Sequence, residues 1–200
     1  MAATRIPAPE RRTALIEAAL RVVAREGIVR ATTRTIVAEA GMSLASFHYA
    51  FESRDELIDE LIRTVVAREQ LAVVPELEPG IGLRELLENG LARYLDHLRA
   101  DPEYEQAMLE LTHYALRSPD RRELATRQYA RYTELATETL ALAAAHTGAA
   151  WRIPIEHVAR MLVAYTDGLT LSWLVDRDDA AARRLAASAA RAIAELADAS

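Results

Sequence analysis

The chain has 200 residues, of which 51% are hydrophobic and 27% charged, so it has enough apolar material for a globular core. It contains no cysteine, which excludes disulfide bonds and thiolate metal sites. The N-terminal residues lack the apolar core of a signal peptide, and the longest apolar stretch, 161–175, is too short to span a bilayer and contains Asp167. We therefore expect a cytoplasmic protein with no membrane partner.

The formal net charge of −6 is distributed unevenly along the chain. Residues 1–54 carry eight arginines against five glutamates, whereas the remainder carries 16 arginines against 25 acidic residues. A basic N-terminal part on an acidic body can attract a polyanion to one end of the protein. The overall negative charge therefore does not exclude a nucleic-acid partner.

Apolar residues recur mainly at spacings of three and four, and β-branched alternation is almost absent. This pattern predicts an all-α fold of about nine helices without a sheet. Caps and glycines predict where the first helices begin and end. These helices are expected at about 8–26, between the N-cap Thr32 and Gly41, at about 44–50, and from the capping box at 53–56 to about residue 74.

Proline and glycine separate the remaining helices. Residues 75–82 contain two prolines and two glycines, which interrupt the helical pattern. Pro102 and Pro119 each follow an N-capping residue and suit the first position of a helix. Further helices are expected at about 83–100, from 102, at 119–146, at 155–175 and at 179–197, with a loop at 147–154.

The segment from Thr32 to Leu57 has the features of a helix-turn-helix. Gly41 can adopt the positive φ of a tight turn, while Ala38 and Ala40 allow two helices to approach closely. Ser43 can cap the second helix. The apolar underside is expected at Ile36, Val37, Met42, Phe47 and Phe51. Such a pair can place its second helix in a major groove of DNA.

This segment, TTRTIVAEAGMSLASFHYAFESRDEL, resembles the DNA-binding region of the TetR (tetracycline-repressor) family. The resemblance rests on Thr32, Ile36-Val37-Ala38, Ala40-Gly41-Met42-Ser43, Phe47-His48-Tyr49, and Phe51 with Arg54. It implies a helix-turn-helix DNA-binding domain over residues 1–52, followed by a helical regulatory and dimerisation domain over residues 53–200. The chain departs from the usual pattern at His48, Ala50 and Arg54, where tyrosine, histidine and lysine are common.

By the same resemblance, DNA is contacted mainly from the starts of the two short helices. The contacts are predicted at Thr32, Thr33, Arg34, Ser43, Leu44, Ala45, Ser46, His48, Tyr49 and Arg54. A cation in the first turn of a helix is disfavoured by the helix dipole, but a phosphate between the two reverses this, which favours a phosphate contact for Arg54. The alternatives are a solvated Arg54 and a partly buried His48.

The C-terminal part resembles the choline-responsive subgroup of this family in the segments LTHYALRSPDRRELATRQYARY and LVAYTDGLTLSWLVD. The resemblance implies a ligand cavity and a homodimer built on the last two helices. The helix at 155–175 is apolar on almost every side, which suits packing against both a partner subunit and its own domain. The small residues of the last helix suit a four-helix interface. The core of a monomer would explain the same pattern.

Aromatic and sulfur-containing residues of the C-terminal helices are candidates for the cavity. Ligand contacts are predicted at Tyr94, Met108, His113, Tyr129, Met161 and Tyr165. Such residues would accept a hydrophobic or aromatic molecule, or a cation through cation–π contact, and core packing is the alternative for each. Asp167 lies in an apolar helix and is expected to make a structural hydrogen bond.

These observations predict a ligand-responsive DNA-binding regulator, a repressor that a small molecule releases from a palindromic operator. One alternative is a helical-bundle enzyme or metal protein, since Glu110 and His113 form a Glu-x-x-His pair, but a di-iron site needs two such pairs. No serine elbow, phosphate loop or dinucleotide motif is present in the sequence, so neither an enzyme nor a cofactor is expected. Another alternative is an N-terminal part that binds a protein instead of DNA.

Overall fold

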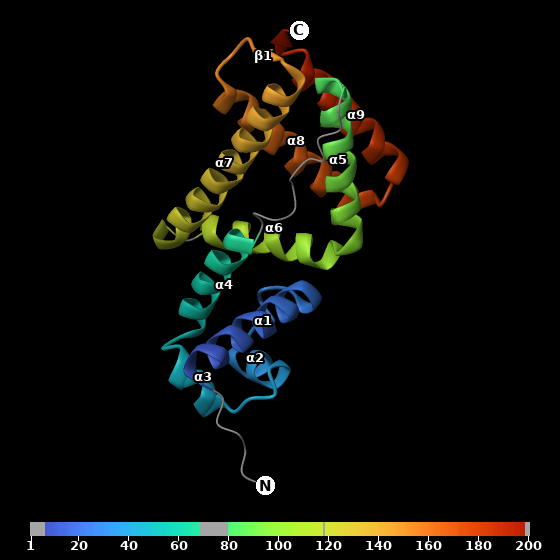
Figure 1. Ribbon diagram of the computed structural model, residues 1–200. Helices are drawn as coiled ribbons and strands as arrows, with labels where there is room; N and C mark the ends of the chain where they lie inside the picture. Colours follow the sequence, from blue (N-terminus) through green and yellow to red (C-terminus); the bar gives the residue numbers. More distant parts are fainter. Residues whose placement is uncertain (1–6, 69–79, 118, 199–200) are drawn as a thin grey trace. The chain divides into compact units, whose positions relative to one another are not determined.

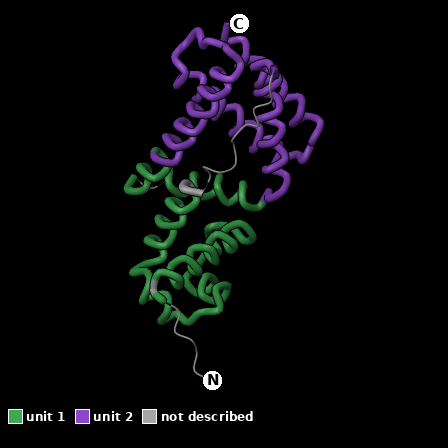
Figure 2. Tube along the Cα trace, in the orientation of Figure 1, with its two compact units in different colours: residues 1–68, 103–126 green, residues 69–102, 127–200 purple. Residues whose placement is uncertain are grey.

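The computed structural model describes residues 7–68, 80–117 and 119–198, most of which are helical. The chain forms two compact units, shown in green and purple in Figure 2. The head unit contains residues 1–68 and 103–126, and the body unit contains residues 69–102 and 127–200. This division differs from the single domain boundary expected at residue 52, because the segments that follow residue 52 and residue 102 pack with the N-terminal helices.

The head unit is built from the N-terminal helices and one helix from the middle of the chain (Figure 1). Its elements are α1 (Ala8–Glu26), α2 (Thr33–Glu39), α3 (Leu44–Ala50), α4 (Arg54–Arg68), most of α6 (Pro102–Arg117), the short 3-10 helix η2 (Pro119–Arg121) and the start of α7 (Arg122–Thr147). The predicted bounds agree closely with these. The expected extension of α4 to about residue 74 lies outside the described residues.

One apolar core holds the head unit together. Leu15 of α1, Ile36 of α2 and Phe47 of α3 are buried in it almost completely. From α6, Met108 and Leu111 enter the same core. The middle of the chain therefore packs directly with the helices that carry the helix-turn-helix.

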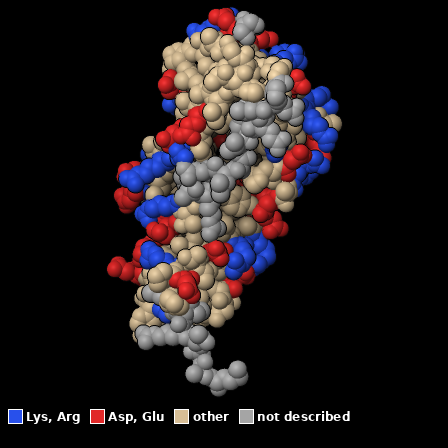
Figure 3. Space-filling view, in the orientation of Figure 1, with Lys and Arg blue, Asp and Glu red and all other residues tan. Residues whose placement is uncertain are grey.

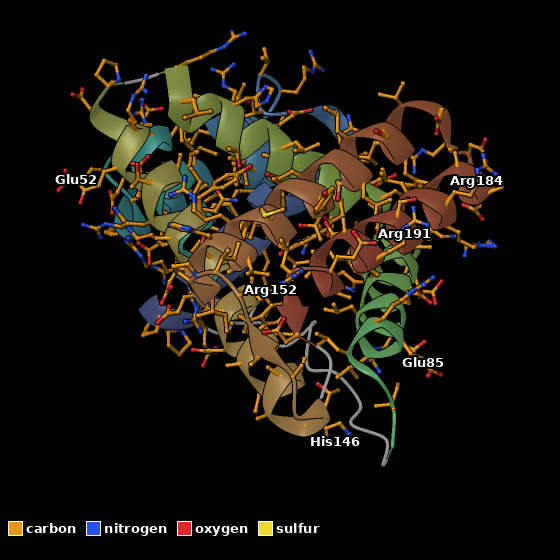
Figure 4. The ribbon with its side chains drawn as sticks, turned by 90° about the horizontal axis from the view of Figure 1, so that it is seen from above. Glu52, Glu85, His146, Arg152, Arg184 and Arg191 are labelled. Atoms are coloured by element: carbon orange, nitrogen blue, oxygen red, sulfur yellow. The ribbon has the colours of Figure 1, made fainter. Side chains whose placement is uncertain are left out.

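The body unit consists of α5 (Leu83–Ala100), most of α7, α8 (Ile155–Asp176) and α9 (Asp179–Ala194). Helices α5 and α8 both pack against α9. The indole Nε1 of Trp173 on α8 donates to Oδ1 of Asp179 at 2.8 Å, which fastens the start of α9. In Figure 4 the exposed Arg184 and Arg191 project from α9.

A short antiparallel pairing corrects the expectation of a protein without a sheet. Strand β1 (Ala150–Trp151) lies in the predicted loop at 147–154 and pairs with β2 (Ala197–Asp198). Helix α9 therefore ends at Ala194, earlier than the predicted residue 197. Two-residue strands are too short to show an alternating pattern, and their pairing joins segments far apart in sequence. Periodicity could not have predicted them.

The surface carries charges of both signs. On the face shown in Figure 3, basic and acidic side chains are interspersed. Within the described ranges, none of the helices combines the length and hydropathy that crossing a membrane requires.

Candidate functional site

The helix-turn-helix of α2 and α3 has the geometry that its sequence predicts. Gly41 adopts a φ of 64° in the turn, and the amide of Met42 donates to the carbonyl of Val37 at 2.8 Å. Thr32 caps α2 by accepting from the amide of Thr35 at 3.2 Å. Ser43 caps α3 in the same way, and its hydroxyl accepts from the amide of Ser46 at 3.1 Å. Both helix starts are therefore fixed by their own side chains.

The predicted underside of this motif is the buried one. Ile36, Val37, Phe47 and Phe51 lie in the head core, and Met42 packs against it. The rings of Phe47 and Phe51 are 5.8 Å apart, in a tilted arrangement. Helix α3 is thereby anchored on one side, and its other side remains exposed.

The exposed side carries most of the predicted DNA-contact residues. Thr32, Arg34, Ser43, Leu44, Ala45, His48 and Tyr49 are exposed, while Thr33 and Ser46 are half-buried. Tyr49 is 80% exposed and Leu44 is 45% exposed, and neither side chain packs in the head core. His48 contacts the edge of the Phe47 ring but is not buried. Polar and apolar groups at the leading end of α3 are thus available to a partner.

Most head arginines are engaged by carboxylates. Arg21 and Arg25 both pair with Glu39, at 2.8 and 3.0 Å, and these bonds lower the pKa of Glu39. By contrast, no acidic side chain in the described part of the chain pairs with Arg34, which is exposed at the second position of α2. Its charge is therefore available to a phosphate.

Arg12 of α1 fixes the far end of α3. Its Nη1 donates to the carbonyl of Ala50 at 2.6 Å, and its guanidinium lies 4.1 Å from the centre of the Phe51 ring. It also pairs with Glu56 at 3.0 Å. A hydrogen bond from the backbone amide of Glu52 lowers the pKa of the Glu56 carboxyl, and the guanidinium of Arg12 lowers it further. No local pattern indicates this contact, because it joins α1 to α3 through a side chain that has the sequence context of an ordinary surface residue.

Arg54 is directed toward the protein backbone. Its Nε donates to the carbonyl of Ala31 and its Nη2 to the carbonyl of Ile28, both at 2.6 Å. Its side chain is 28% exposed, so Arg54 is not the freely solvated surface residue that was the alternative to a DNA contact. Only part of its guanidinium is accessible to DNA. The sequence missed this role, which depends on the two-pronged geometry of a guanidinium.

The six predicted ligand-contact residues fall into both units. Tyr94, Tyr129, Met161 and Tyr165 belong to the body unit, whereas Met108 and His113 lie on α6 in the head unit. Met108 is 5% exposed and packs in the head core, and His113 is exposed. Met108 is therefore a core residue, which was the alternative to a ligand contact. It shares this core with apolar residues of α1 and α4.

In the body unit, several tyrosines make polar contacts. Tyr129 of α7 donates its hydroxyl to Oδ2 of Asp167 on α8 at 3.0 Å, which confirms the expected structural hydrogen bond. Burial raises the pKa of Asp167, and the bond from Tyr129 opposes this only in part. The rings of Tyr129 and Tyr132 are 5.5 Å apart. Two aromatic rings and a carboxylate are thus brought together between α7 and α8.

A small pocket of about 240 Å³ lies elsewhere in the body, at the turn between α8 and α9. Trp173, Asp176 and Leu185 are among the residues that line it, and none of the six predicted residues does. Nearby, Leu171 and Val175 of α8 are 56% and 79% exposed. This end of the helix pair presents apolar surface that nothing in the described chain covers.

The Glu110–His113 pair is not arranged as a metal site. Glu110 accepts a hydrogen bond from the amide of Ile28 at 2.7 Å, and His113 is exposed. Among the described residues, no group of three or more histidine or acidic side chains is placed to hold a metal ion. The arrangement gives no support to the metal-protein alternative.

Comparison with known proteins identifies two family models. Residues 15–61 match the bacterial regulatory proteins of the tetR family, and residues 83–198 match the C-terminal domain of BetI-type transcriptional repressors. The HTH-type nicotine-responsive transcriptional repressor HdnoR of Paenarthrobacter nicotinovorans is 28% identical over 175 residues, which cover 88% of this chain and 89% of HdnoR. The HTH-type transcriptional regulator BetI of Agrobacterium fabrum is 38% identical over 79 residues, only 40% of this chain and 38% of that protein.

Solved structures agree with these matches. A transcriptional regulator from Pseudomonas aeruginosa PAO1 superimposes with a TM-score of 0.72 at 26% identity, over 96% of this chain and 91% of that one. A regulator from Saccharomonospora viridis in complex with choline shares the fold, with a TM-score of 0.71 at 22% identity over 94% and 98% of the two chains. Because the second family model matches more than half of the sequence, the chain belongs to the TetR family of bacterial transcriptional regulators, with a C-terminal domain of the BetI repressor type.

Proposed function

We propose that this regulator is a homodimeric repressor that binds a palindromic operator through α2 and α3 and is released from it by a small cationic molecule. The observation that carries the DNA-binding part is the two-sided character of α3. Its apolar side is locked into the head core, while its leading end exposes polar and apolar groups. A recognition helix requires this combination of a rigid base and an accessible edge. DNA binding implies action in the cytoplasm.

The DNA contacts divide by chemistry into two groups. Arg34 and the hydroxyls of Thr32 and Thr33, at the start of α2, suit phosphate oxygens, which position the protein without reading sequence. The remaining contacts, which suit the edges of bases and the adjoining backbone, are Ser43, Leu44, Ala45, Ser46, His48 and Tyr49. Leu44 and Ala45 suit the methyl group of thymine.

The exposed apolar surface at the α8–α9 turn supports a dimer formed by the last two helices. Leu171, Val175 and Leu185 are 56%, 79% and 37% exposed, which leaves apolar area in water in a single chain. Two copies related by a twofold axis would cover these side chains and present two α3 helices to two half-sites.

The polar contacts between α7 and α8 support a cationic effector. Tyr129 and Tyr132 offer aromatic faces, and Asp167 offers a carboxylate whose charge is disfavoured by burial. A cation bound there would gain cation–π contact and would relieve that penalty. The relative HdnoR is described as nicotine-responsive, and the Saccharomonospora viridis regulator was solved in complex with choline. Both molecules contain nitrogen and can be cations. The other predicted body contacts are Tyr94, Met161 and Tyr165.

Release would follow from a difference in effector affinity between two conformations of the dimer. A coupling of about 1–3 kcal/mol is typical of allosteric proteins and would weaken operator binding from several-fold to about a hundredfold. The effector would have to bind the conformer in which the two α3 helices do not match the half-site spacing.

The DNA-binding part is tested by selecting operator sequences from a random duplex pool with the purified dimer, then titrating the selected duplex by fluorescence anisotropy at several salt concentrations. We expect a twofold-symmetric consensus and an affinity that falls steeply with salt. Absence of salt-dependent binding to any duplex would refute the assignment.

The effector is tested by calorimetric titration with choline chloride, nicotine and the uncharged choline analogue 3,3-dimethylbutan-1-ol. At least one cation should bind the wild type, and Asp167→Asn should weaken that binding at least tenfold. Equal affinity for the uncharged analogue, or an unaffected Asp167→Asn variant, would contradict a cationic effector while leaving the DNA-binding proposal intact.

A further inference from the structure

In the loop between α1 and α2, two charged side chains from other helices form hydrogen bonds with the backbone of one residue. This is Ile28, which follows Gly27 at the end of α1. Its amide donates to Oε2 of Glu110 on α6 at 2.7 Å, and its carbonyl accepts from Nη2 of Arg54 on α4 at 2.6 Å. All three residues belong to the head unit. We call Glu110, Ile28 and Arg54 the Ile28 clamp.

The Glu110 side of the clamp requires a close approach. Gly27 has a φ of 81°, which an L side chain rarely adopts. A Cβ at this position would also lie 3.2 Å from Oε2 of Glu110. The backbone conformation and the lack of a side chain at Gly27 together let the carboxylate reach the Ile28 amide. Hydrogen bonds from an amide to a carboxylate are stronger than those between neutral groups.

The Arg54 side of the clamp is braced by residues of α6 and η2. Besides Ile28, Arg54 holds the carbonyl of Ala31 at 2.6 Å. Its guanidinium lies 5.9 Å from the centre of the Tyr114 ring, and its Nη1 is 3.5 Å from Asp55. Asp55 in turn accepts from the hydroxyl of Tyr114 at 3.0 Å and pairs with Arg121 at 2.6 Å.

The clamped loop leads directly into the start of α2. The carbonyl of Arg30 accepts from the amide of Thr32 at 2.7 Å and from the hydroxyl of Thr35 at 2.7 Å. Thr32 is the N-cap of α2 and a proposed phosphate contact. The place of the loop therefore determines where the DNA-facing start of α2 lies, and the loop is held by α4 and α6.

We infer that Glu110 and Arg54 are positioning residues for DNA binding, which fix the start of α2 through Ile28 without touching DNA themselves. The inference rests on the proposed function, since it assumes that α2 and α3 meet a duplex. Through Glu110, α6 also holds the loop that leads into that surface.

The test of Glu110 compares one clamp variant with two controls, all made in the full 200-residue chain. Glu110→Ala removes the acceptor, and Glu110→Gln retains an oxygen that can still accept. Glu103→Ala removes another glutamate of α6 that is exposed. The affinity for the selected operator duplex is measured by anisotropy, and the exchange rate of the Ile28 amide is measured by NMR.

We expect Glu110→Ala to weaken operator binding about tenfold and to speed exchange of the Ile28 amide. Glu110→Gln should recover most of both losses, and Glu103→Ala should change neither. The melting temperature shows whether each variant is folded. If Glu110→Ala fails to fold, Glu110→Gln decides, because its neutral amide oxygen accepts more weakly than a carboxylate. Faster exchange of the Ile28 amide in Glu110→Gln should then be accompanied by weaker operator binding, and faster exchange with wild-type affinity would overturn the inference. Wild-type affinity in a folded Glu110→Ala would overturn the inference.

Arg54 is tested by the salt dependence of binding. Loss of a phosphate contact lowers the slope of log affinity against log salt by about one. Arg54→Ala should weaken binding with an unchanged slope, whereas Arg34→Ala should lower the slope. A slope that falls equally in Arg54→Ala would make Arg54 a phosphate contact and overturn its positioning role. If the wild type itself binds no duplex, the proposed function fails; wild-type binding that is insensitive to both clamp residues defeats only the clamp.

Discussion

Tyr129 of α7 and Asp167 of α8 are joined by a hydrogen bond of 3.0 Å, which links an exposed tyrosine to a partly buried carboxylate. Burial holds the pKa of Asp167 above its usual 3.8, and the hydroxyl of Tyr129 only partly offsets this. A carboxyl group with a higher pKa in the folded state binds its proton more tightly there than in the unfolded chain. Its ionised form therefore destabilises the fold at neutral pH, and this penalty disappears below the unfolded value.

The neutral variant Asp167→Asn should consequently melt at a higher temperature than the wild type at pH 7, because asparagine can still accept from Tyr129 without a buried charge. The difference should shrink as the pH falls through the raised pKa and should vanish below about 3.8. Differential scanning calorimetry at a series of pH values measures it. Asp120→Asn, at an exposed position of η2, serves as the control and should show no such trend. A lower melting temperature for Asp167→Asn at pH 7 would contradict the argument.

Asp179 behaves in the opposite way. The indole of Trp173, and then Arg99 and Arg183, lower its pKa below the usual 3.8. A depressed pKa contributes stability above the unfolded value, and that stability is lost as the pH falls through the folded pKa. We therefore expect Asp179→Ala to lower the melting temperature at pH 7 and to lose most of this effect below the folded pKa. A constant difference in melting temperature from pH 7 to pH 2 would contradict this expectation. It would indicate that the loss of the hydrogen bond from Trp173, and not the loss of the negative charge of Asp179, accounts for the effect.

The exposed apolar end of α8 makes a prediction about assembly. Val175→Glu and Leu171→Glu each place a charge where the proposed partner subunit would pack, and burying an unpaired charge is strongly unfavourable. Both variants should sediment as monomers at micromolar concentration in analytical ultracentrifugation. Leu142→Glu is the matched control, because Leu142 of α7 is 50% exposed and lies outside the proposed interface. Dimers of unchanged stability in both α8 variants would move the interface elsewhere.

Local signals explain why the helices could be predicted from the sequence. Thr32 and Ser43 cap the helices that follow them, Gly41 takes the positive φ of the turn, and Pro102 begins α6. Each of these effects depends on residues within a few positions of one another. The bounds of α1, α3 and α5 were predictable for the same reason.

Long-range choices could not be predicted in this way. The apolar stripe of α6 predicts that the helix is packed, but not that Met108 and Leu111 enter the head core. The charge of Arg54 predicts a hydrogen-bond acceptor, which could belong to DNA or to the protein itself. In the structure its acceptors are the carbonyls of Ile28 and Ala31. The β1–β2 pairing joins residues nearly fifty positions apart. Such contacts depend on the tertiary arrangement, which the pattern of a single helix does not contain.

Substitutions at Phe47 and Tyr49, two positions apart in α3, can separate effects on folding from effects on DNA recognition. Phe47 is 1% exposed and packs in the head core, whereas Tyr49 is 80% exposed. Phe47→Ala should destabilise the head by about 3–5 kcal/mol, because truncating a buried phenylalanine leaves a cavity. Tyr49→Ala should change the free energy of unfolding by no more than about 0.5 kcal/mol, since exposed side chains contribute little.

Operator binding should respond differently to these two substitutions. Tyr49→Ala should lower operator affinity at least tenfold in a protein that melts like the wild type, because the proposed contact is lost from an intact surface. Phe47→Ala should lose affinity together with the melting transition of the head. Chemical denaturation and anisotropy on the same samples separate the two effects. If Tyr49→Ala binds the selected duplex like the wild type, the base and backbone contacts must lie at the leading end of α3, at Ser43 to Ser46, and Tyr49 must be removed from the recognition surface.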